Sequence, residues 1–61
     1  MKVSTEVKAL TDLRSDDEPD KVLVESGTQG TITEEMDDGS YVVAFNNGVN
    51  TYCEPFEIEP S

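Results

Sequence analysis

The chain has 61 residues, with fourteen Asp and Glu against four Lys and Arg, a formal net charge of −10 and a hydrophobic content of 34%. This length allows one small domain, residues 1–61, whose net stability is expected near the low end of about 5–15 kcal/mol. Such a charge repels nucleic-acid phosphates and anionic lipid head groups and attracts basic proteins, so direct binding of nucleic acid or a membrane is disfavoured. The acidity also fits a surface that only keeps the domain soluble.

The residue types argue against catalysis and against bound metals. The chain has one cysteine, Cys53, and no His, so it lacks the ligands of a structural zinc site and the usual proton carrier near neutral pH. We expect no enzyme activity, no metal and no cofactor. The lone cysteine, the absence of a signal-peptide pattern near the N-terminus and the absence of a long apolar stretch predict a cytoplasmic protein.

Residues 2–13 fit either of two structures. Val3, Val7 and Leu10 fall at helical spacing, whereas the residues from Val3 to Ala9 also alternate as on one face of a strand. We favour the strand because the segment is rich in β-branched residues, which are stiff at χ1. The helix is the alternative.

Residues 13–21 are predicted to form an acidic loop, because no apolar residue follows Leu13 and Pro19 disfavours the helical conformation of the residue before it. The spacing lacks the central Gly and closing Glu of an EF-hand calcium loop. We interpret the loop as solvated and as a candidate binding surface. Its carboxylates are Asp16, Asp17, Glu18 and Asp20.

Residues 23–45 predict a β-hairpin, with an alternating run over 28–36, a turn at Asp38-Gly39 and a strand over 41–45. Gly30 is expected where a positive φ or a close backbone approach is needed, as at a bulge. The inward side chains are expected to be Ile32, Tyr41, Val43 and Phe45. The carboxylates expected to point outward at the hairpin tip, and so to be candidates for binding, are Glu34, Glu35, Asp37 and Asp38.

A second tight turn is expected at residues 46–48, leading into a strand over 49–53. Glu54-Pro55 should interrupt pairing because Pro lacks a ladder donor, and a last short strand should then point Phe56 and Ile58 inward. These five strands predict an all-β protein, a single small SH3-like barrel with an acidic loop after its first strand.

Three segments carry a resemblance to known families. Residues 27–32, the strand 41–45 and the ending 57–60 resemble the G-x-x-G-x-V hairpin and V-x-F strand of KOW and Tudor domains, small photosystem accessory barrels and uncharacterised small bacterial SH3-like proteins. The opening, residues 7–13, is similar to the start of one such bacterial family. The resemblance implies the fold more than the function. A KOW-like role implies basic RNA-binding loops, which the acidic loop disfavours, and a Tudor-like role implies an aromatic cage for methylated Lys or Arg.

The leading hypothesis is a non-catalytic interaction module that docks on a basic surface of a protein partner, including as a nucleic-acid-mimicking inhibitor or accessory factor. An alternative is recognition of a cationic or methylated peptide by Tyr41, Tyr52 or Phe56 with Glu54, although most of the aromatic side chains are expected in the core. A third is a structural subunit of a larger complex, joined through a free sheet edge. The chain is taken as a monomer by default.

Overall fold

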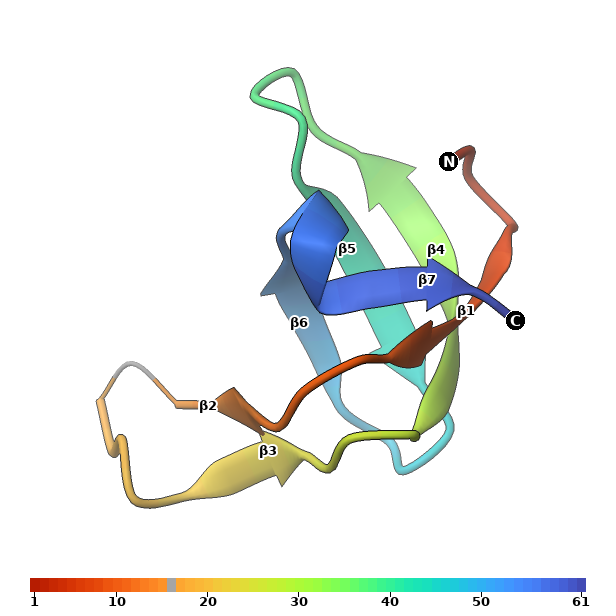
Figure 1. The fold of residues 1–61 in the computed structure, drawn as a ribbon. Coiled ribbons are helices and arrows are strands. Elements are labelled where there is room, and N and C mark those ends of the chain that lie inside the picture. The colour runs from red at the N-terminus through yellow and green to blue at the C-terminus, as the bar shows by residue number, and fades with distance from the viewer. Residues whose placement is uncertain (16) are drawn as a thin grey trace.

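The computed structural model describes residues 1–15 and 17–61. These residues form two antiparallel sheets (Figure 1). The larger sheet has five strands in the order β6-β5-β4-β1-β7, and β2 pairs with β3 in a separate two-stranded sheet. The elements in chain order are β1 Glu6–Ala9, β2 Leu13–Arg14, β3 Val22–Val24, β4 Gln29–Glu35, β5 Tyr41–Phe45, β6 Asn50–Cys53, the 3-10 helix η1 Pro55–Glu57 and β7 Ile58–Pro60.

The all-β prediction is confirmed, and so is the strand in residues 2–13, which is β1. The prediction of a five-stranded SH3-like barrel is confirmed only as far as its all-β class, because the described strands divide into a five-stranded and a two-stranded sheet and form no closed barrel. The loop prediction for 13–21 is wrong at its start. Leu13 and Arg14 form β2 and pair with Val24 and Val22 of β3, so this hairpin makes its own small sheet.

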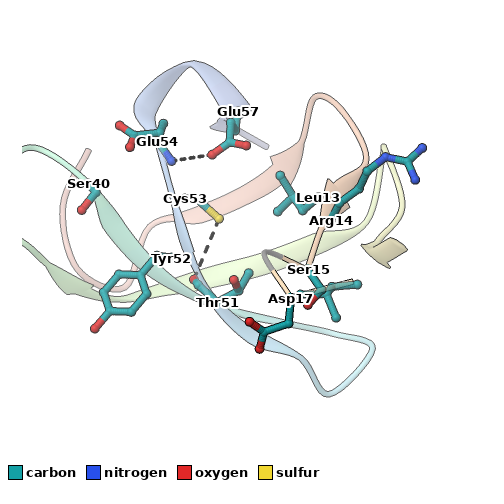
Figure 2. Close-up of a pocket in the computed structure, with 11 residues that line it drawn as sticks. Leu13, Arg14, Ser15, Asp17, Ser40, Thr51, Tyr52, Cys53, Glu54 and Glu57 are labelled. Carbon is teal, nitrogen blue, oxygen red and sulfur yellow. Dashed lines mark hydrogen bonds between the residues drawn. The ribbon is translucent and has the colours of Figure 1, made fainter. Parts of the chain in front are cut away.

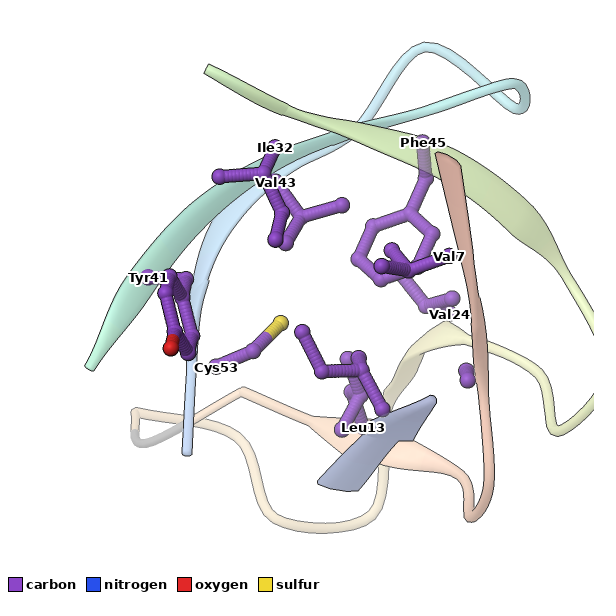
Figure 3. Packing of buried hydrophobic residues seen from close by; sticks show 10 residues of the cluster. Val7, Leu13, Val24, Ile32, Tyr41, Val43, Phe45 and Cys53 are labelled. Atoms are coloured by element: carbon purple, nitrogen blue, oxygen red, sulfur yellow. The ribbon is translucent and has the colours of Figure 1, made fainter. Parts of the chain in front are cut away.

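The hydrophobic core lies between the five-stranded sheet and the β2–β3 pair (Figure 3). Leu13 from β2 and Val24 from β3 pack into the same cluster as Val43 of β5, so the small sheet covers apolar side chains that an open sheet would leave in water. The buried hydrophobic residues are Val7, Ala9, Leu13, Val24, Ile32, Tyr41, Val43, Phe45, Cys53 and Ile58. The inward positions predicted for β4 and β5 are therefore confirmed.

One aromatic side chain departs from the prediction. Phe56 is 77% exposed, although it was expected to point inward. The reason is local: Pro55, Phe56 and Glu57 form η1, and a helical turn breaks the two-residue alternation before it resumes at Ile58. The interruption of pairing after Glu54 is confirmed.

Gly30 lies where two backbones approach closely, which confirms one of the two reasons given for it. A Cβ at this position would stand 2.8 Å from the carbonyl oxygen of Ala44 and 3.0 Å from Cα of Phe45. The bulge itself falls further along β4: the register shifts between Ile32 and Glu34, so that Thr33 is the extra residue. Such a bulge bends and twists its strand.

The two predicted turns are confirmed, and Gly39 and Gly48 hold φ values of 90° and 89° within them. Asn47 adds a tertiary contact to the second turn. Its Nδ2 donates to the main-chain oxygen of Leu23 at 3.1 Å, and its Oδ1 accepts from the main-chain nitrogen of Val49 at 3.1 Å. This one side chain therefore fixes the turn and ties the β5–β6 hairpin to β3.

Candidate functional site

The predicted carboxylates lie in two separate places. Asp17, Glu18 and Asp20 are exposed in the loop between β2 and β3, and Asp16 lies outside the described residues. The other four, Glu34, Glu35, Asp37 and Asp38, are exposed at the β4–β5 end. In Figure 1 the β4–β5 tip stands at the top and the β2–β3 loop at the lower left, so the structure does not unite them in one patch.

Few of these charges are neutralised by nearby cations. Within residues 1–15 and 17–61 the single ion pair joins Lys8 Nζ to Glu59 Oε1 at 3.3 Å, with both side chains about half exposed. Arg14, beside the acidic loop, donates from Nη1 to the main-chain oxygen of Pro19 at 3.2 Å. The negative field of the loop and the tip therefore extends into solvent.

Asp38 is the carboxylate whose environment is most defined. Its Oδ1 accepts from Ser40 Oγ at 2.6 Å and from the main-chain nitrogen of Ser40 at 3.0 Å. The hydroxyl donor, followed by the main-chain donor, lowers the pKa of Asp38 below its ordinary value of 3.8. At neutral pH this carboxylate is therefore ionised and held in a fixed orientation within the turn.

Replacing Ser40 by alanine should raise the pKa of Asp38 toward 3.8 but leave it slightly lowered, because the main-chain donor of residue 40 is retained. Since the folded pKa is the lower one, the stability due to this charge is present above about 3.8 and is lost as the pH falls through the folded value. An NMR titration of the Asp38 carboxyl carbon in both proteins measures the change. An identical pKa in both would contradict the assignment of the hydroxyl as the main cause.

A cavity of about 460 Å³ lies between β2 and β6 (Figure 2). Three carboxylates line it, those of Asp17, Glu54 and Glu57, and the one cation that lines it, Arg14, points its guanidinium away from them in Figure 2. The main-chain nitrogen of Glu54 donates to Glu57 Oε1 at 2.8 Å, which orients one of the carboxylates at the start of η1. The other lining residues are Leu13, Ser15, Leu23, Ser40, Thr51, Tyr52 and Cys53.

The aromatic candidates are divided by the fold. Tyr41 is 8% exposed, and its hydroxyl accepts from the N-terminal ammonium of Met1 at 3.2 Å, so its ring belongs to the core and not to a binding surface. Tyr52 and Phe56 are exposed, but Tyr52 lines the cavity and Phe56 does not. The three rings therefore form no common cage. Of the predicted site residues, the cavity brings together Asp17, Tyr52 and Glu54.

The distribution of charge along the sequence also indicates this region, although the overall composition does not show it. From Ser40 to Cys53 the chain has no charged residue, although charged residues make up 30% of the whole. This run forms β5 and β6, and the register pairs Val42 with both Glu34 and Tyr52 on the outer side of the sheet. The uncharged hairpin therefore has an acidic residue, Glu34 of β4, directly beside Val42.

Cys53 lies at the back of the cavity with 1% of its surface exposed. Burial, and secondarily the negative charge of Glu57, raises the pKa of its thiol from 9.0 to about 11. Because the thiolate is the reactive form, the folded protein holds this sulfur as an unreactive thiol at neutral pH.

This raised pKa predicts a fall in stability at alkaline pH. Between about 9 and about 11 the unfolded thiol is ionised and the folded one is not, so the free energy of unfolding should decrease by about 1–2 kcal/mol across that window. Urea denaturation at several pH values measures it. Cys53→Ala serves as the control for titrating Lys and Tyr, and it should lose less stability over the same range. Parallel curves for the two proteins would contradict the prediction.

Within residues 1–15 and 17–61, no three His, Cys, Asp or Glu side chains are grouped so as to hold a metal ion. The same residues include no helix with the length and hydrophobicity that a bilayer span requires. Comparison of the chain with protein-family models, with curated proteins and with solved structures gives no match.

Proposed function

We propose that this chain is a non-catalytic interaction module of the cytoplasm that docks on a basic surface of a protein partner, and that its two sheets form an open variant of an SH3-like barrel. The arrangement of both sheets over one core supports the fold. A rigid small domain of this kind offers its loops, its cavity and its sheet edge to a partner. Inhibition by imitation of nucleic acid is one form that this docking could take.

The observation that supports the proposal most is the uncompensated charge. Fourteen carboxylate residues face four cationic ones, and the described residues form one ion pair, between Lys8 and Glu59. A protein gains little stability from such a surface, because like charges repel one another in the folded state. A basic partner gains a faster encounter and a selective one, since complementary charge steers association and rejects acidic competitors.

Capture of partners from extracts of the source cell tests the proposal. The immobilised protein should retain basic proteins at about 0.05 M salt and release them at about 1 M, where the screening length falls from over 10 Å to about 3 Å. Mass spectrometry identifies the proteins and their charge. Retention of only neutral or acidic proteins, with no dependence on salt, would refute the proposal.

A second candidate, recognition of a methylated basic side chain, is favoured by the ring of Tyr52, which is 67% exposed and lines the same cavity as Asp17 and Glu54. A cation above the face of an aromatic ring gains about 0.5–1 kcal/mol at an exposed site. A peptide that contains trimethyllysine should then bind more tightly than the same peptide with lysine. Equal affinity for the two peptides would exclude this candidate and leave the first intact.

A further inference from the structure

β6 lies at one edge of the five-stranded sheet. The main-chain nitrogen of Phe45 donates to the oxygen of Val49 at 2.8 Å, which sets the phase of the ladder between β5 and β6. Because alternate residues of an antiparallel strand bond to a given neighbour, Thr51 bonds toward β5, whereas the peptide groups of Asn50 and Tyr52 point away from the sheet. Among the described strands β6 pairs with β5 alone, and neither residue takes part in a main-chain hydrogen bond recorded outside the strand ladders.

The two edges of this sheet differ in how they are protected. β7, at the opposite edge, ends in Pro60, which has no N–H, and its Glu59 is paired with Lys8. Proline and charged side chains are the usual means by which an edge strand avoids pairing. The four residues of β6, from Asn50 to Cys53, include neither. β6 is therefore an edge that can accept another strand.

The groups beside β6 indicate the charge of that strand. The cavity that borders β6 is lined by the carboxylates of Asp17, Glu54 and Glu57. A second copy of this chain would bring a further charge of −10 to the same place, which electrostatic repulsion disfavours. An extended segment rich in Lys or Arg can form main-chain hydrogen bonds with the edge of β6 and place positive charges beside the carboxylates of the cavity.

We propose that β6 binds an extended basic segment of the partner as an added strand. The main-chain groups of Asn50 and Tyr52 pair with the segment, and its alternate Lys or Arg side chains enter the cavity beside Asp17 and Glu54. This inference rests on the proposed function and specifies its contact. Main-chain pairing supplies affinity in such complexes, and the alternate side chains supply specificity.

Synthetic peptides test the pairing directly. The probe is a capped peptide of about eight alternating Lys and Val residues, a usual length for a strand, and its matched control is N-methylated at every second residue on one edge. The methylated peptide has the same charge but lacks donors, so it should bind about 3- to 10-fold more weakly for each hydrogen bond lost. The unmethylated peptide should slow amide hydrogen exchange at Asn50 and Tyr52, as measured by NMR.

Protein variants test the same contact from the other side. Tyr52→Pro removes the main-chain N–H that points away from the sheet, and edge strands tolerate proline at such a position. Tyr52→Val is the matched control, because it also removes the aromatic ring but keeps the N–H. Only the proline variant should weaken binding of the unmethylated peptide, by about 3- to 10-fold for the one hydrogen bond that it removes. In the second comparison, Asp17→Asn with Glu54→Gln should weaken binding more than Glu6→Gln with Glu25→Gln, which changes the net charge equally at exposed positions that do not line the cavity.

Each outcome decides one proposal. Equal affinities for the two peptides, no binding of either, or unchanged exchange at Asn50 and Tyr52 would overturn strand addition. The proposed function is judged separately by the salt-dependent capture of basic proteins. If Tyr52→Pro fails to fold by circular dichroism, the methylated peptide and the exchange measurement still give the answer on wild-type protein.

Discussion

Replacing Gly30 by alanine is expected to destabilise the protein by about 3 kcal/mol, a large part of the roughly 5 kcal/mol that a domain of this size holds. The new methyl group would meet Ala44 O at 2.8 Å, Val43 Cγ1 at 2.9 Å and Cα of Phe45 at 3.0 Å. Two of these atoms are backbone of β5, so relief requires β4 and β5 to separate and break the ladder between them. Urea denaturation followed by far-UV circular dichroism gives the free energy of unfolding.

The matched control for Gly30 is Gln29→Ala, on the same strand but with an exposed side chain. Surface substitutions away from special contacts usually change stability by no more than about 0.5 kcal/mol. A similar loss in both variants would mean that the cost arises from β4 in general and not from the close approach at Gly30. A loss below about 1 kcal/mol for Gly30→Ala would show that β5 moves aside easily.

Ile32→Ala should cost about 3–4 kcal/mol, within the range measured for truncation of large buried aliphatic side chains. Ile32 is 1% exposed and is the largest of the fully buried side chains. Ten of the described residues are buried and hydrophobic, so few side chains can move to fill the space that Ile32 would leave, and a cavity would remain. The variant should be partly unfolded at room temperature, which the fluorescence of the buried Tyr41 and circular dichroism can both follow.

Val42→Ala is the control for Ile32. Val42 is half-buried on the outer side of β5, opposite the core, and its truncation is expected to cost about 1 kcal/mol through lost strand propensity and cross-strand contact. If both variants lose the same stability, the two faces of the sheet are equally packed, and the assignment of a single core between the two sheets is wrong.

The sequence predicted correctly those parts of the fold that depend on neighbouring residues in the chain. Alternation placed Ile32, Val43 and Phe45 in the core, and the glycine turns placed the hairpins. The failures have tertiary causes. Leu13 and Arg14 become a strand because β3 folds back on them, and a two-residue strand is too short to show any period. Phe56 was predicted to point inward because the two-residue alternation of a strand was extended through it, whereas Pro55–Glu57 form the 3-10 helix η1.

The site was less predictable than the fold. Charge density identified the exposed carboxylates of the loop and the hairpin tip, but density along the chain cannot show that Asp17 shares a cavity with Tyr52 and Glu54. That juxtaposition depends on β2 lying beside β6, which residues far apart in sequence determine together. Tyr41 was named for binding because aromatic rings suit cation recognition, whereas its inward phase on β5 buries it.

The uncharged hairpin formed by β5 and β6 also bears on how the protein behaves at high concentration. An exposed edge strand without charged residues can pair with the same strand of another copy and so promote aggregation. Natural sequences often place charged residues, called gatekeepers, beside such a strand. Here the flanking charges are carboxylates such as Glu34 and Glu54, and the net negative charge of the chain falls to zero near its isoelectric point of about 4.1. The acidity that selects a basic partner therefore also keeps copies of the chain apart, and both effects disappear together when the solution becomes acidic.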